Sequence, residues 1–434
     1  FEEVKKNTDM LGKLSVYLPE SRYTITPVKD GYVPTRRNIE IHMDETIDDL
    51  RITLCKTVGG GTGNNSGNQI DTIRPDVGIN SYSQVLSLRS ASSGVITQDG
   101  RLYMCGDNRY GYIGDGTTED RYTPTKILDH VISVSLGDEH SGAITQDGSL
   151  YMWGCNYSGQ IGDGTTEDRY KPTKILDHVI AVSLGDDHSG AITQDGSLYM
   201  WGWNSSGQIG DGTTEKRYTP TKILDHVIAV SLGGEHSGAI TQDGSLYMWG
   251  WNSSGQIGDG TTEKRYTPTK ILDHVIAVSL GGEHSGAITQ DGSLYMWGWN
   301  SSGQIGDGTT EYRRYTPTKI LDHVIAVSLG YEHSGAITQD GSLYMWGWNR
   351  DGQIGDGTTE NRYKPTKILD HVIAVSLGGG HSGAITQNGS LYMWGANWIG
   401  QIGDGTTEDR YTPNKITIPG GVALPSALTS TVST

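Results

Sequence analysis

The hexapeptide Gly-Asp-Gly-Thr-Thr-Glu occurs seven times in this chain of 434 residues and constrains its fold more than any other feature. Successive copies are 48 residues apart, except for one step of 49 residues where Arg313 or Arg314 is inserted. The third and fourth copies of the surrounding unit, residues 188–235 and 236–283, are identical. A repeat of this length with several strand-like segments is typical of a β-propeller or a solenoid. The first glycines of the seven copies are Gly114, Gly162, Gly210, Gly258, Gly306, Gly355 and Gly403.

Four segments of each unit show the alternation expected of short strands, and in letters they are VIAVSL, GAIT, SLYMWG and TPTKIL. The Asp-Gly pair between the second and third segments is a strong hairpin signal. Seven units of four antiparallel strands predict an all-β fold, a seven-bladed β-propeller over residues 81–424. We expect residues 420–425 to pair with the first unit and so close the ring.

The residues outside the repeats form three further segments. Residues 1–57 contain four short alternating runs and predict a small β-sandwich-like module that precedes the propeller. Within it, YTITPVKDGYVPTRRNIEIHM resembles the small immunoglobulin-like or carboxypeptidase-regulatory-like modules of bacterial surface proteins. Residues 58–80 have the composition of a glycine-rich linker, and residues 425–434 are a C-terminal tail.

The repeat carries a family resemblance in the patterns GxxHSxAI, DGxLYxWGxN and GQIGDG and in a following Pro-Thr-Lys-Ile. These resemble the repeats of the regulator-of-chromosome-condensation family, in its bacterial secreted or surface form. The resemblance implies a seven-bladed propeller. It also implies a choice among the family's tasks, which include nucleotide exchange on a small GTPase, chromatin binding, ultraviolet sensing and β-lactamase inhibition. A shared fold does not select one of these tasks.

Composition excludes several classes of protein. The net charge of −17 argues against a nucleic-acid partner, because such partners need a basic face. No apolar run is long enough for a transmembrane segment. The three cysteines do not form a disulfide framework, and we expect Cys105 and Cys155 not to be disulfide-bonded to each other.

Several repeated motifs resemble catalytic or metal-binding sites, but we expect them to be structural. A histidine recurs at one position of six units, and we expect each to hydrogen-bond inside its own blade rather than to bind metal or act in catalysis. The tryptophan of each Trp-Gly pair should pack between blades. The second histidine series, in Leu-Asp-His, should be solvated. We therefore expect no catalytic residue, no cofactor and no metal. The six positions are His140, His188, His236, His284, His333 and His381.

The units differ from one another in three places, which are the two residues before the repeated histidine, the tetrad after Trp-Gly, and the residue after Thr-Thr-Glu. In a four-stranded meander the loops that carry these places leave from one edge of the blade, so the differences should gather on one face. The varying residues are rich in Trp, Tyr and small polar types, as in antibody paratopes. The predicted partner-binding residues are Trp203, Trp251, Trp299, Trp348, Trp398, Tyr157, Tyr331, Arg350, Asp351, Arg109, Tyr110, Lys216, Lys264 and Tyr312.

These observations predict a non-catalytic protein that binds a macromolecule, most simply another protein, through its variable face. We expect it outside the cell or on the surface of a bacterium. A glycan stacked on the tryptophans is an alternative. Nucleotide exchange and chromatin binding are further alternatives that the resemblance implies, but no repeat carries a long insertion and the chain is acidic.

Overall fold

The computed structural model describes residues 85–424, which form seven separate four-stranded antiparallel sheets. The innermost strands are β1 (Leu86–Arg89), β5 (Val131–Leu136), β9 (Val179–Leu184), β13 (Val227–Leu232), β17 (Val275–Leu280), β21 (Val324–Leu329) and β25 (Val372–Leu377). The second strands are β2 (Ser92–Ile96), β6 (His140–Thr145), β10 (His188–Thr193), β14 (His236–Thr241), β18 (His284–Thr289), β22 (His333–Thr338) and β26 (His381–Thr386).

The two outer positions of each sheet complete the blades. The third strands are β3 (Leu102–Gly106), β7 (Leu150–Gly154), β11 (Leu198–Gly202), β15 (Leu246–Gly250), β19 (Leu294–Trp299), β23 (Leu343–Gly347) and β27 (Leu391–Gly395). The outermost strands are β4 (Arg121–Leu128), β8 (Arg169–Leu176), β12 (Arg217–Leu224), β16 (Arg265–Leu272), β20 (Arg313–Leu321), β24 (Arg362–Leu369) and β28 (Arg410–Ile416).

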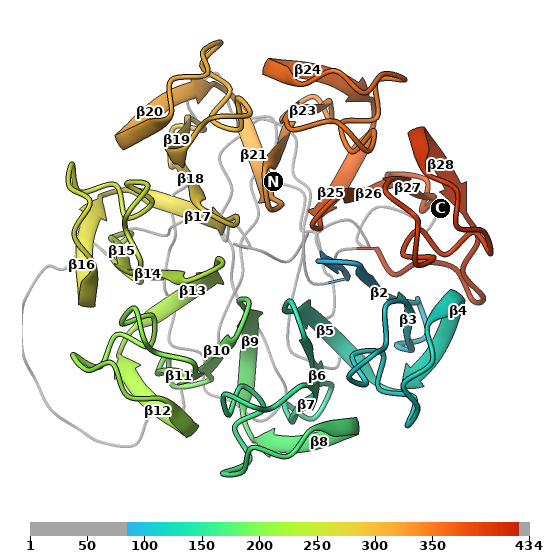
Figure 1. Ribbon diagram of the computed structural model, residues 1–434, viewed down its shortest axis with the longest axis horizontal. Coiled ribbons are helices and arrows are strands. Elements are labelled where there is room, and N and C mark those ends of the chain that lie inside the picture. Colours follow the sequence, from blue (N-terminus) through green and yellow to red (C-terminus); the bar gives the residue numbers. More distant parts are fainter. Residues whose placement is uncertain (1–84, 425–434) are drawn as a thin grey trace, which may run out of the picture. The chain divides into compact units, whose positions relative to one another are not determined.

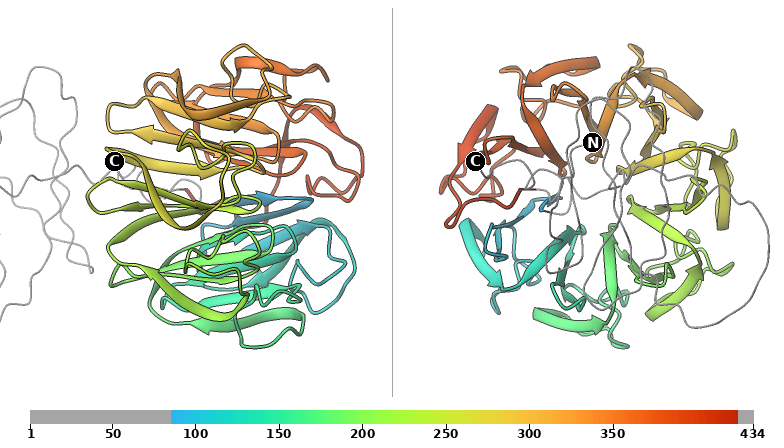
Figure 2. Two further views of the ribbon diagram at one scale, coloured as in Figure 1. Left: turned by 60° about the vertical axis from the view of Figure 1, so that its left-hand side comes forward. Right: turned by 180° about the vertical axis from the view of Figure 1, so that it is seen from behind.

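The seven sheets stand around a central axis as the blades of a propeller (Figure 1). Each blade is a meander of four consecutive strands, and the innermost strands of neighbouring blades touch one another. Views from the side and from behind show the described residues as a thick disc (Figure 2). The predicted all-β, seven-bladed fold is confirmed. The predicted module of residues 1–57, linker of residues 58–80 and tail of residues 425–434 lie outside the described residues.

Each blade turns between its second and third strands at an Asp-Gly or Asn-Gly pair. In the second blade Gly148 has a φ of 80°, a conformation that glycine adopts without steric cost. The side chain of Asp147 accepts hydrogen bonds from the Thr145 hydroxyl at 2.6 Å and from the Ser149 backbone N–H at 3.1 Å. The sequence pair therefore fixes the hairpin in the way expected of this turn.

The hydrophobic core is divided into seven clusters that lie between blades. One cluster joins Met248 and Ile257 of the fourth blade to Leu280 and Trp297 of the fifth, and the other clusters repeat this arrangement. The Trp297 indole is fully buried and donates a hydrogen bond to the backbone carbonyl of Gln256 in the preceding blade at 2.9 Å. The predicted packing role of the Trp-Gly tryptophans is confirmed. Since every core is shared, no blade is a complete folding unit.

The repeated histidines also connect blades, which corrects one expectation from the sequence. Nε2 of His236 lies 2.9 Å from the Ser285 hydroxyl of the next blade, and all six histidines make the equivalent contact. The expectation that each histidine bonds inside its own blade is therefore wrong. The serine of each pair donates onward to a backbone carbonyl, as Ser285 does to Gln256 at 2.8 Å. The meander alone does not reveal this, because the partner comes from the neighbouring unit.

The ring closes where the C-terminal end of the described chain meets the first blade. Val422 forms an antiparallel bridge with Thr97, and the Ala423 N–H donates to the Ile96 carbonyl at 2.9 Å. Val422 is buried in a cluster that also contains Leu86 of β1 and Ile373 of β25. The predicted pairing of this segment with the first unit is confirmed.

The outermost strands are exposed edges that could pair with other chains. Each of the seven carries a proline, which has no N–H to offer to an added strand. The prolines are Pro124, Pro172, Pro220, Pro268, Pro317, Pro365 and Pro413.

Candidate functional site

The three variable places of the repeat meet on one face of the disc. In the fourth blade, the backbone N–H of Trp251, which follows the third strand, donates to the carbonyl of Glu235, which precedes the repeated histidine, at 2.9 Å. On the other side of the disc, the Asp-Gly turns contact the Leu-Asp-His turns, as when the Gln242 N–H donates to the His226 carbonyl at 2.8 Å. We name the first side the variable face; it is the side seen in Figure 1.

The long loop between the third and fourth strands is held rigidly by a buried asparagine. In the fourth blade, the Asn252 amide donates to the Thr261 carbonyl at 3.1 Å and to the Glu263 carbonyl at 3.0 Å, and its oxygen accepts from the Ile257 N–H at 2.9 Å. The same loop contains an ion pair between Asp259 and Arg265. The invariant letters of the loop thus form its internal framework, and the variable side chains project from it.

Four tryptophans in consecutive blades form the tryptophan arc, defined by Trp203, Trp251, Trp299 and Trp348. All four side chains are half-buried, so each keeps part of its ring at the surface. A cation of the same blade lies over each ring, at distances to the ring centroid of 4.4 Å for Lys216, 4.4 Å for Lys264, 5.5 Å for Arg313 and 4.8 Å for Arg350. Such cation–π contacts hold both partners in place.

The residue after Thr-Thr-Glu takes one of two roles. Where it is Asp or Asn, its side chain accepts the backbone N–H of the loop asparagine, as Asp168 does from Asn156 at 2.8 Å. Where it is Lys, it lies over the tryptophan and reaches the neighbouring blade, as Lys216 reaches the Ser158 hydroxyl at 3.3 Å. The fifth blade has Tyr312, which packs edge-on against Trp299 with ring centroids 5.5 Å apart.

The other predicted residues lie on the same face with different exposure. Among the aromatic residues of this set, Tyr312, Trp398 and Tyr157 are the most exposed, at 69%, 60% and 50%. Tyr110, Arg109 and Arg350 are also exposed, and Asp351 is half-buried.

Tyr331 lies at the axis rather than on the outer part of the face. The Arg89 guanidinium lies 5.3 Å from its ring centroid and forms an ion pair of 2.6 Å with Asp186. Arg89 is nearly fully buried, and its Nε has no hydrogen-bond partner. Arg89, Asp186 and Tyr331 belong to the first, third and sixth blades, so this axial cluster ties blades together across the centre.

The axial cluster was not predicted from the sequence, although a signal was present. The first unit has Arg89 where the others have glycine, and Ser92 where they have histidine. In the other blades a side chain at the glycine position would strike the histidine ring, as at Gly137, where a Cβ would lie 2.5 Å from Cε1 of His140. The loss of the histidine therefore makes room for the arginine.

A carboxylate residue stands immediately before the repeated histidine in each of the second to sixth blades. Glu235, Glu283 and Glu332 are exposed, and each accepts a hydrogen bond from a serine of the preceding blade at 2.8, 2.6 and 3.0 Å. Burial, together with the nearby Asp186, Glu139 and Asp138, raises the pKa of Asp187 to about 6, although Tyr157 hydrogen-bonds to it. We name this set the carboxylate row; its members are Glu139, Asp187, Glu235, Glu283 and Glu332.

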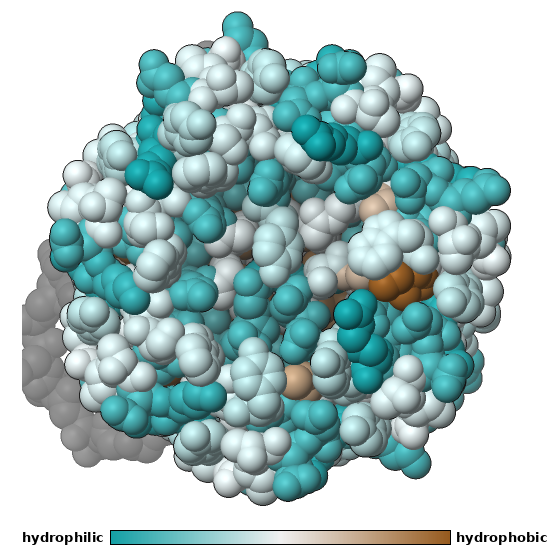
Figure 3. All heavy atoms as spheres, in the orientation of Figure 1, coloured by the Kyte–Doolittle hydropathy of each residue, from teal (hydrophilic) through white to brown (hydrophobic). Residues whose placement is uncertain are grey.

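The surface of the variable face is mostly polar or near neutral (Figure 3). One hydrophobic patch lies where the blade formed by β25–β28 adjoins the blade formed by β1–β4. Within residues 85–424, no group of three or more His, Cys, Asp or Glu side chains is placed to hold a metal ion. Cys105 and Cys155 are unpaired, as predicted. In the same part of the chain, no helix is long and apolar enough to cross a membrane.

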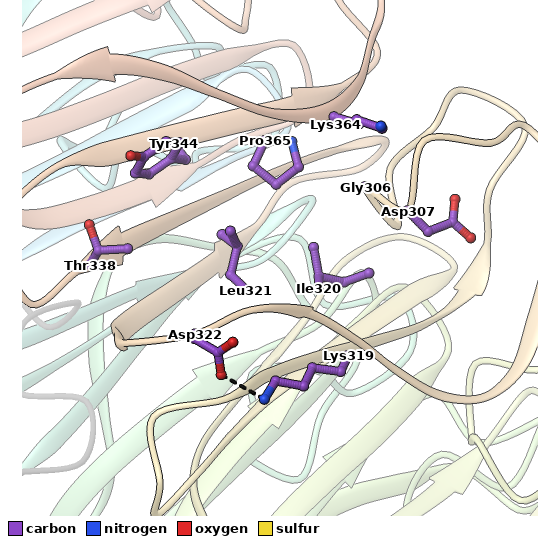
Figure 4. A pocket seen from close by; sticks show the side chains of 10 residues that line it. All are labelled: Gly306, Asp307, Lys319, Ile320, Leu321, Asp322, Thr338, Tyr344, Lys364 and Pro365. Atoms are coloured by element: carbon purple, nitrogen blue, oxygen red, sulfur yellow. Dashed lines mark ion pairs between the residues drawn. The ribbon is translucent and has the colours of Figure 1, made fainter.

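A groove of about 550 Å³ lies at the rim between the fifth and sixth blades (Figure 4). An ion pair of 2.6 Å between Lys319 and Asp322 lines it, together with Tyr344 and Pro365. The same ion pair recurs in other blades, for example between Lys222 and Asp225. The groove is therefore lined largely by scaffold residues, whereas the variable face distinguishes the blades.

Comparison with known families identifies the repeat. A model described as the regulator of chromosome condensation (RCC1) repeat matches residues 99–144, 147–192 and 195–240, and a second model with this description matches residues 131–160 and 179–208. A model described as an RCC1-like domain matches residues 222–431. No curated protein matches the chain in sequence.

Solved structures share the fold. Human WBSCR16 is 24% identical with a TM-score of 0.67, over 74% of this chain and 94% of that one. Yeast RCC1 (Prp20), solved with Kap60, is 21% identical with a TM-score of 0.68, and the match covers 86% of this chain and 98% of that one. A second structure of Prp20p, from Saccharomyces cerevisiae, is 20% identical with a TM-score of 0.68, and the match covers 83% of this chain and 97% of that one. At these identities the likeness establishes the fold alone.

Proposed function

Because the chain carries regulator-of-chromosome-condensation repeats folded as a seven-bladed propeller, we propose that it is a non-catalytic protein that holds a protein partner on its variable face. The yeast RCC1 structures are described as a complex with Kap60 and in terms of binding to Gsp1p and histones. Yeast RCC1, which shares this fold, thus binds other proteins.

The single observation that carries the proposal is the tryptophan arc on its rigid loops. Half-buried aromatic rings supply contact area and lose little conformational entropy on binding. Here cations hold the rings, and buried asparagines such as Asn252 hold the loops. The remaining parts of the repeat, including the Asp-Gly turns of the opposite face, are nearly invariant.

A glycan partner is supported less well than a protein. A sugar needs an open aromatic face for stacking, but Lys264 lies 4.4 Å from the centroid of the Trp251 ring and Lys216 at the same distance from that of Trp203. Nucleotide exchange and chromatin binding remain alternatives that the relatives suggest. They are less well supported because the variable loops differ in length by one residue at most and the chain is acidic.

The location is a second part of the proposal. The N-terminal residues resemble modules of bacterial surface proteins, and we place the chain outside the cell or on its surface on that ground. Fractionation of the source cells, with detection in the cell wall or medium, tests this part separately from binding.

The test of binding compares two double variants of the full chain. Trp251→Ala with Trp299→Ala removes the centre of the arc, and Lys222→Ala with Lys270→Ala removes exposed side chains whose ion-pair partners, Asp225 and Asp273, lie in the turns of the opposite face. Each variant is immobilised and exposed to extracts, and the captured proteins are identified by mass spectrometry. We expect proteins that the wild type and the lysine variant capture and that the tryptophan variant loses.

The expected loss of affinity is about 3 kcal/mol, as for aromatic residues at interface centres. Capture that is equal for all three proteins would contradict the proposal, provided that the variants keep the melting temperature of the wild type. Binding to a glycan array that depends on Trp251 would favour the alternative.

A further inference from the structure

We infer that Asn388 is a site of spontaneous deamidation in the folded protein, and that its conversion to aspartate completes a set of seven hairpin carboxylates. The site lies in the turn between β26 and β27 of the seventh blade, on the face opposite the variable face. The inference is therefore independent of the proposed function. It is carried by the reactive Asn-Gly pair at this turn and by the loss of two contacts that restrain the same turn in other blades.

The seventh hairpin contains the only Asn-Gly pair of the chain, Asn388–Gly389, whereas the equivalent turns of the other six blades are Asp-Gly. The side-chain oxygen of Asn388 accepts hydrogen bonds from the Thr386 hydroxyl at 2.8 Å and from the Ser390 backbone N–H at 3.0 Å. In the second blade, Asp147 accepts the same two hydrogen bonds. A carboxylate at position 388 would therefore keep the contacts of the amide that it replaces.

The reaction needs only water, hydroxide and the groups of the turn. The backbone nitrogen of Gly389 loses its proton to hydroxide and attacks the side-chain carbonyl carbon of Asn388. A new C–N bond forms, the bond to the side-chain nitrogen breaks, and ammonia leaves. Water then opens the resulting succinimide ring to aspartate or isoaspartate. The hydrogen bonds to the side-chain oxygen stabilise the negative charge that develops there, and glycine has no Cβ to obstruct ring closure.

In the other blades, the chain that leads into the next blade clamps this turn. In the fifth blade, the Gly292 carbonyl accepts a hydrogen bond from the Val324 N–H at 2.9 Å, and the Ser293 hydroxyl donates to Asp322 at 3.3 Å. The first contact recurs in all of the first six blades, and the second recurs in the second to sixth. Both partners come from the sequence Leu-Asp-His-Val, which follows the outermost strand.

The seventh hairpin has neither clamp, because residues 417–420 read Thr-Ile-Pro-Gly instead of Leu-Asp-His-Val. Within residues 85–424, no backbone N–H donates to the Gly389 carbonyl, and the Ser390 hydroxyl donates to no carboxylate. Gly389 is half-buried, whereas the turn glycines of the other six blades are buried.

Opening of the turn controls the rate in the folded protein. The Gly389 N–H donates to the Thr386 carbonyl at 2.8 Å, and this hydrogen bond must break before the nitrogen can attack. The missing clamps lower the free energy of such a local opening. An Asn-Gly pair therefore reacts faster in this hairpin than the same pair would in a clamped one.

The turn also suits the product. In the second blade, the Thr145 hydroxyl and the Ser149 N–H hold the pKa of Asp147 below its usual value, so these hydrogen bonds favour the charged carboxylate. The aspartate formed at position 388 gains the same charge-assisted hydrogen bonds. Because ammonia is lost, the change is permanent, and the chain keeps one additional negative charge.

The experiment uses the full chain with Asp291→Asn, which carries two Asn-Gly pairs in one molecule. The flanking residues of positions 291 and 388 are identical from His-Ser-Gly-Ala-Ile-Thr-Gln through Ser-Leu-Tyr-Met-Trp, so the two pairs have the same intrinsic reactivity. The protein is incubated in mildly alkaline buffer, both folded and in urea, and deamidation at each position is followed by peptide mass spectrometry. We expect position 388 to react about fivefold faster in the folded protein, and both positions to react equally fast in urea.

Equal rates at the two positions of the folded protein would overturn the inference, because reactivity would then follow the sequence and not the restraint of the turn. A folded protein that keeps Asn388 intact while the urea sample reacts would also overturn it. Asn388→Asp tests the product separately and should melt at or above the temperature of the wild type. A clear fall in its melting temperature would contradict the claim that the turn suits a carboxylate.

Discussion

At the scale of the residue, the seven copies of the repeat can be compared like a set of variants, because they carry different residues at the same structural position. A glycine precedes the repeated histidine by three positions in six blades, and the first blade replaces both residues together, with Arg89 and Ser92. The reason is steric. At Gly281 an added Cβ would lie 2.4 Å from Cε1 of His284 and 2.5 Å from the Gly330 carbonyl oxygen. The glycine is therefore required by the buried ring beside it.

We predict that Gly281→Ala lowers the free energy of unfolding by about 3 kcal/mol, since neither the histidine nor the backbone can move freely in a close-packed interface. Gly282→Ala is the comparison and should cost less than Gly281→Ala, because an added Cβ there would lie 3.0 Å rather than 2.5 Å from the nearest carbonyl oxygen and other blades carry Asp138, Asp186 or Tyr331 at that position. Adding His284→Ser to Gly281→Ala should recover part of the loss, as the first blade suggests. Urea denaturation of the variants measures these differences, and a Gly281→Ala protein of wild-type stability would contradict the steric argument.

At the scale of the element, sequence patterns predicted the strands within a blade but not the contacts between blades. The Asp-Gly pair and the alternation of VIAVSL locate the strands because they are local signals. The His236–Ser285 contact was predicted wrongly, and the Arg89–Asp186 contact was not predicted, because both join different blades. Their partners depend on how units are placed around the axis. The position of the variable loops on one face was predictable, because in any four-stranded antiparallel meander the first and third loops leave from the same edge of the sheet.

The histidine–serine contacts make the blade interfaces sensitive to acid. Burial lowers the pKa of His140, His188, His236, His284 and His333 to about 3, and that of His381 to about 4. In an unfolded chain histidine titrates near pH 6.5. Between these values the unfolded chain binds protons that the folded chain does not. The free energy of unfolding is therefore greatest above about pH 6.5 and falls as the pH is lowered through this window.

We predict a loss of about 1.4 kcal/mol per histidine for each pH unit below about 6. Urea denaturation at several values between pH 7.5 and 4.5 measures the slope, above the range in which carboxylates with lowered pKa values, such as Asp243, become protonated. His284→Gln removes one of the titrating groups, so it should reduce the slope by about 1.4 kcal/mol per pH unit, the contribution of one proton. Asp187, whose pKa is raised to about 6, acts in the opposite direction and should make the slope slightly smaller. An unfolding free energy that is constant from pH 7 to 5 would contradict the prediction.

At the scale of the whole molecule, stability depends on closing the ring. Every hydrophobic cluster is shared by two blades, so a break at one interface exposes apolar surface on both sides. The interface between the seventh and first blades lacks the buried tryptophan of the others and has Cys105 in its place. The C-terminal strand segment around Val422 compensates by adding buried apolar surface and backbone hydrogen bonds.

We therefore predict that Val422→Asp destabilises the entire ring and not only its last residues. The aspartate would place an unpaired charge within the buried cluster that contains Val85, Leu86 and Ile418, which costs about 3 to 5 kcal/mol. For about 340 ordered residues this corresponds to a fall of roughly 5 °C in the melting temperature. Val422→Thr keeps the shape of the side chain and should lower the melting temperature by less than half as much. Calorimetry should show one cooperative transition that shifts as a whole, because each blade needs both neighbours to bury its core. A small separate transition with the main peak unchanged would mean that the closing segment frays alone and that the ring is held by the blade interfaces without it.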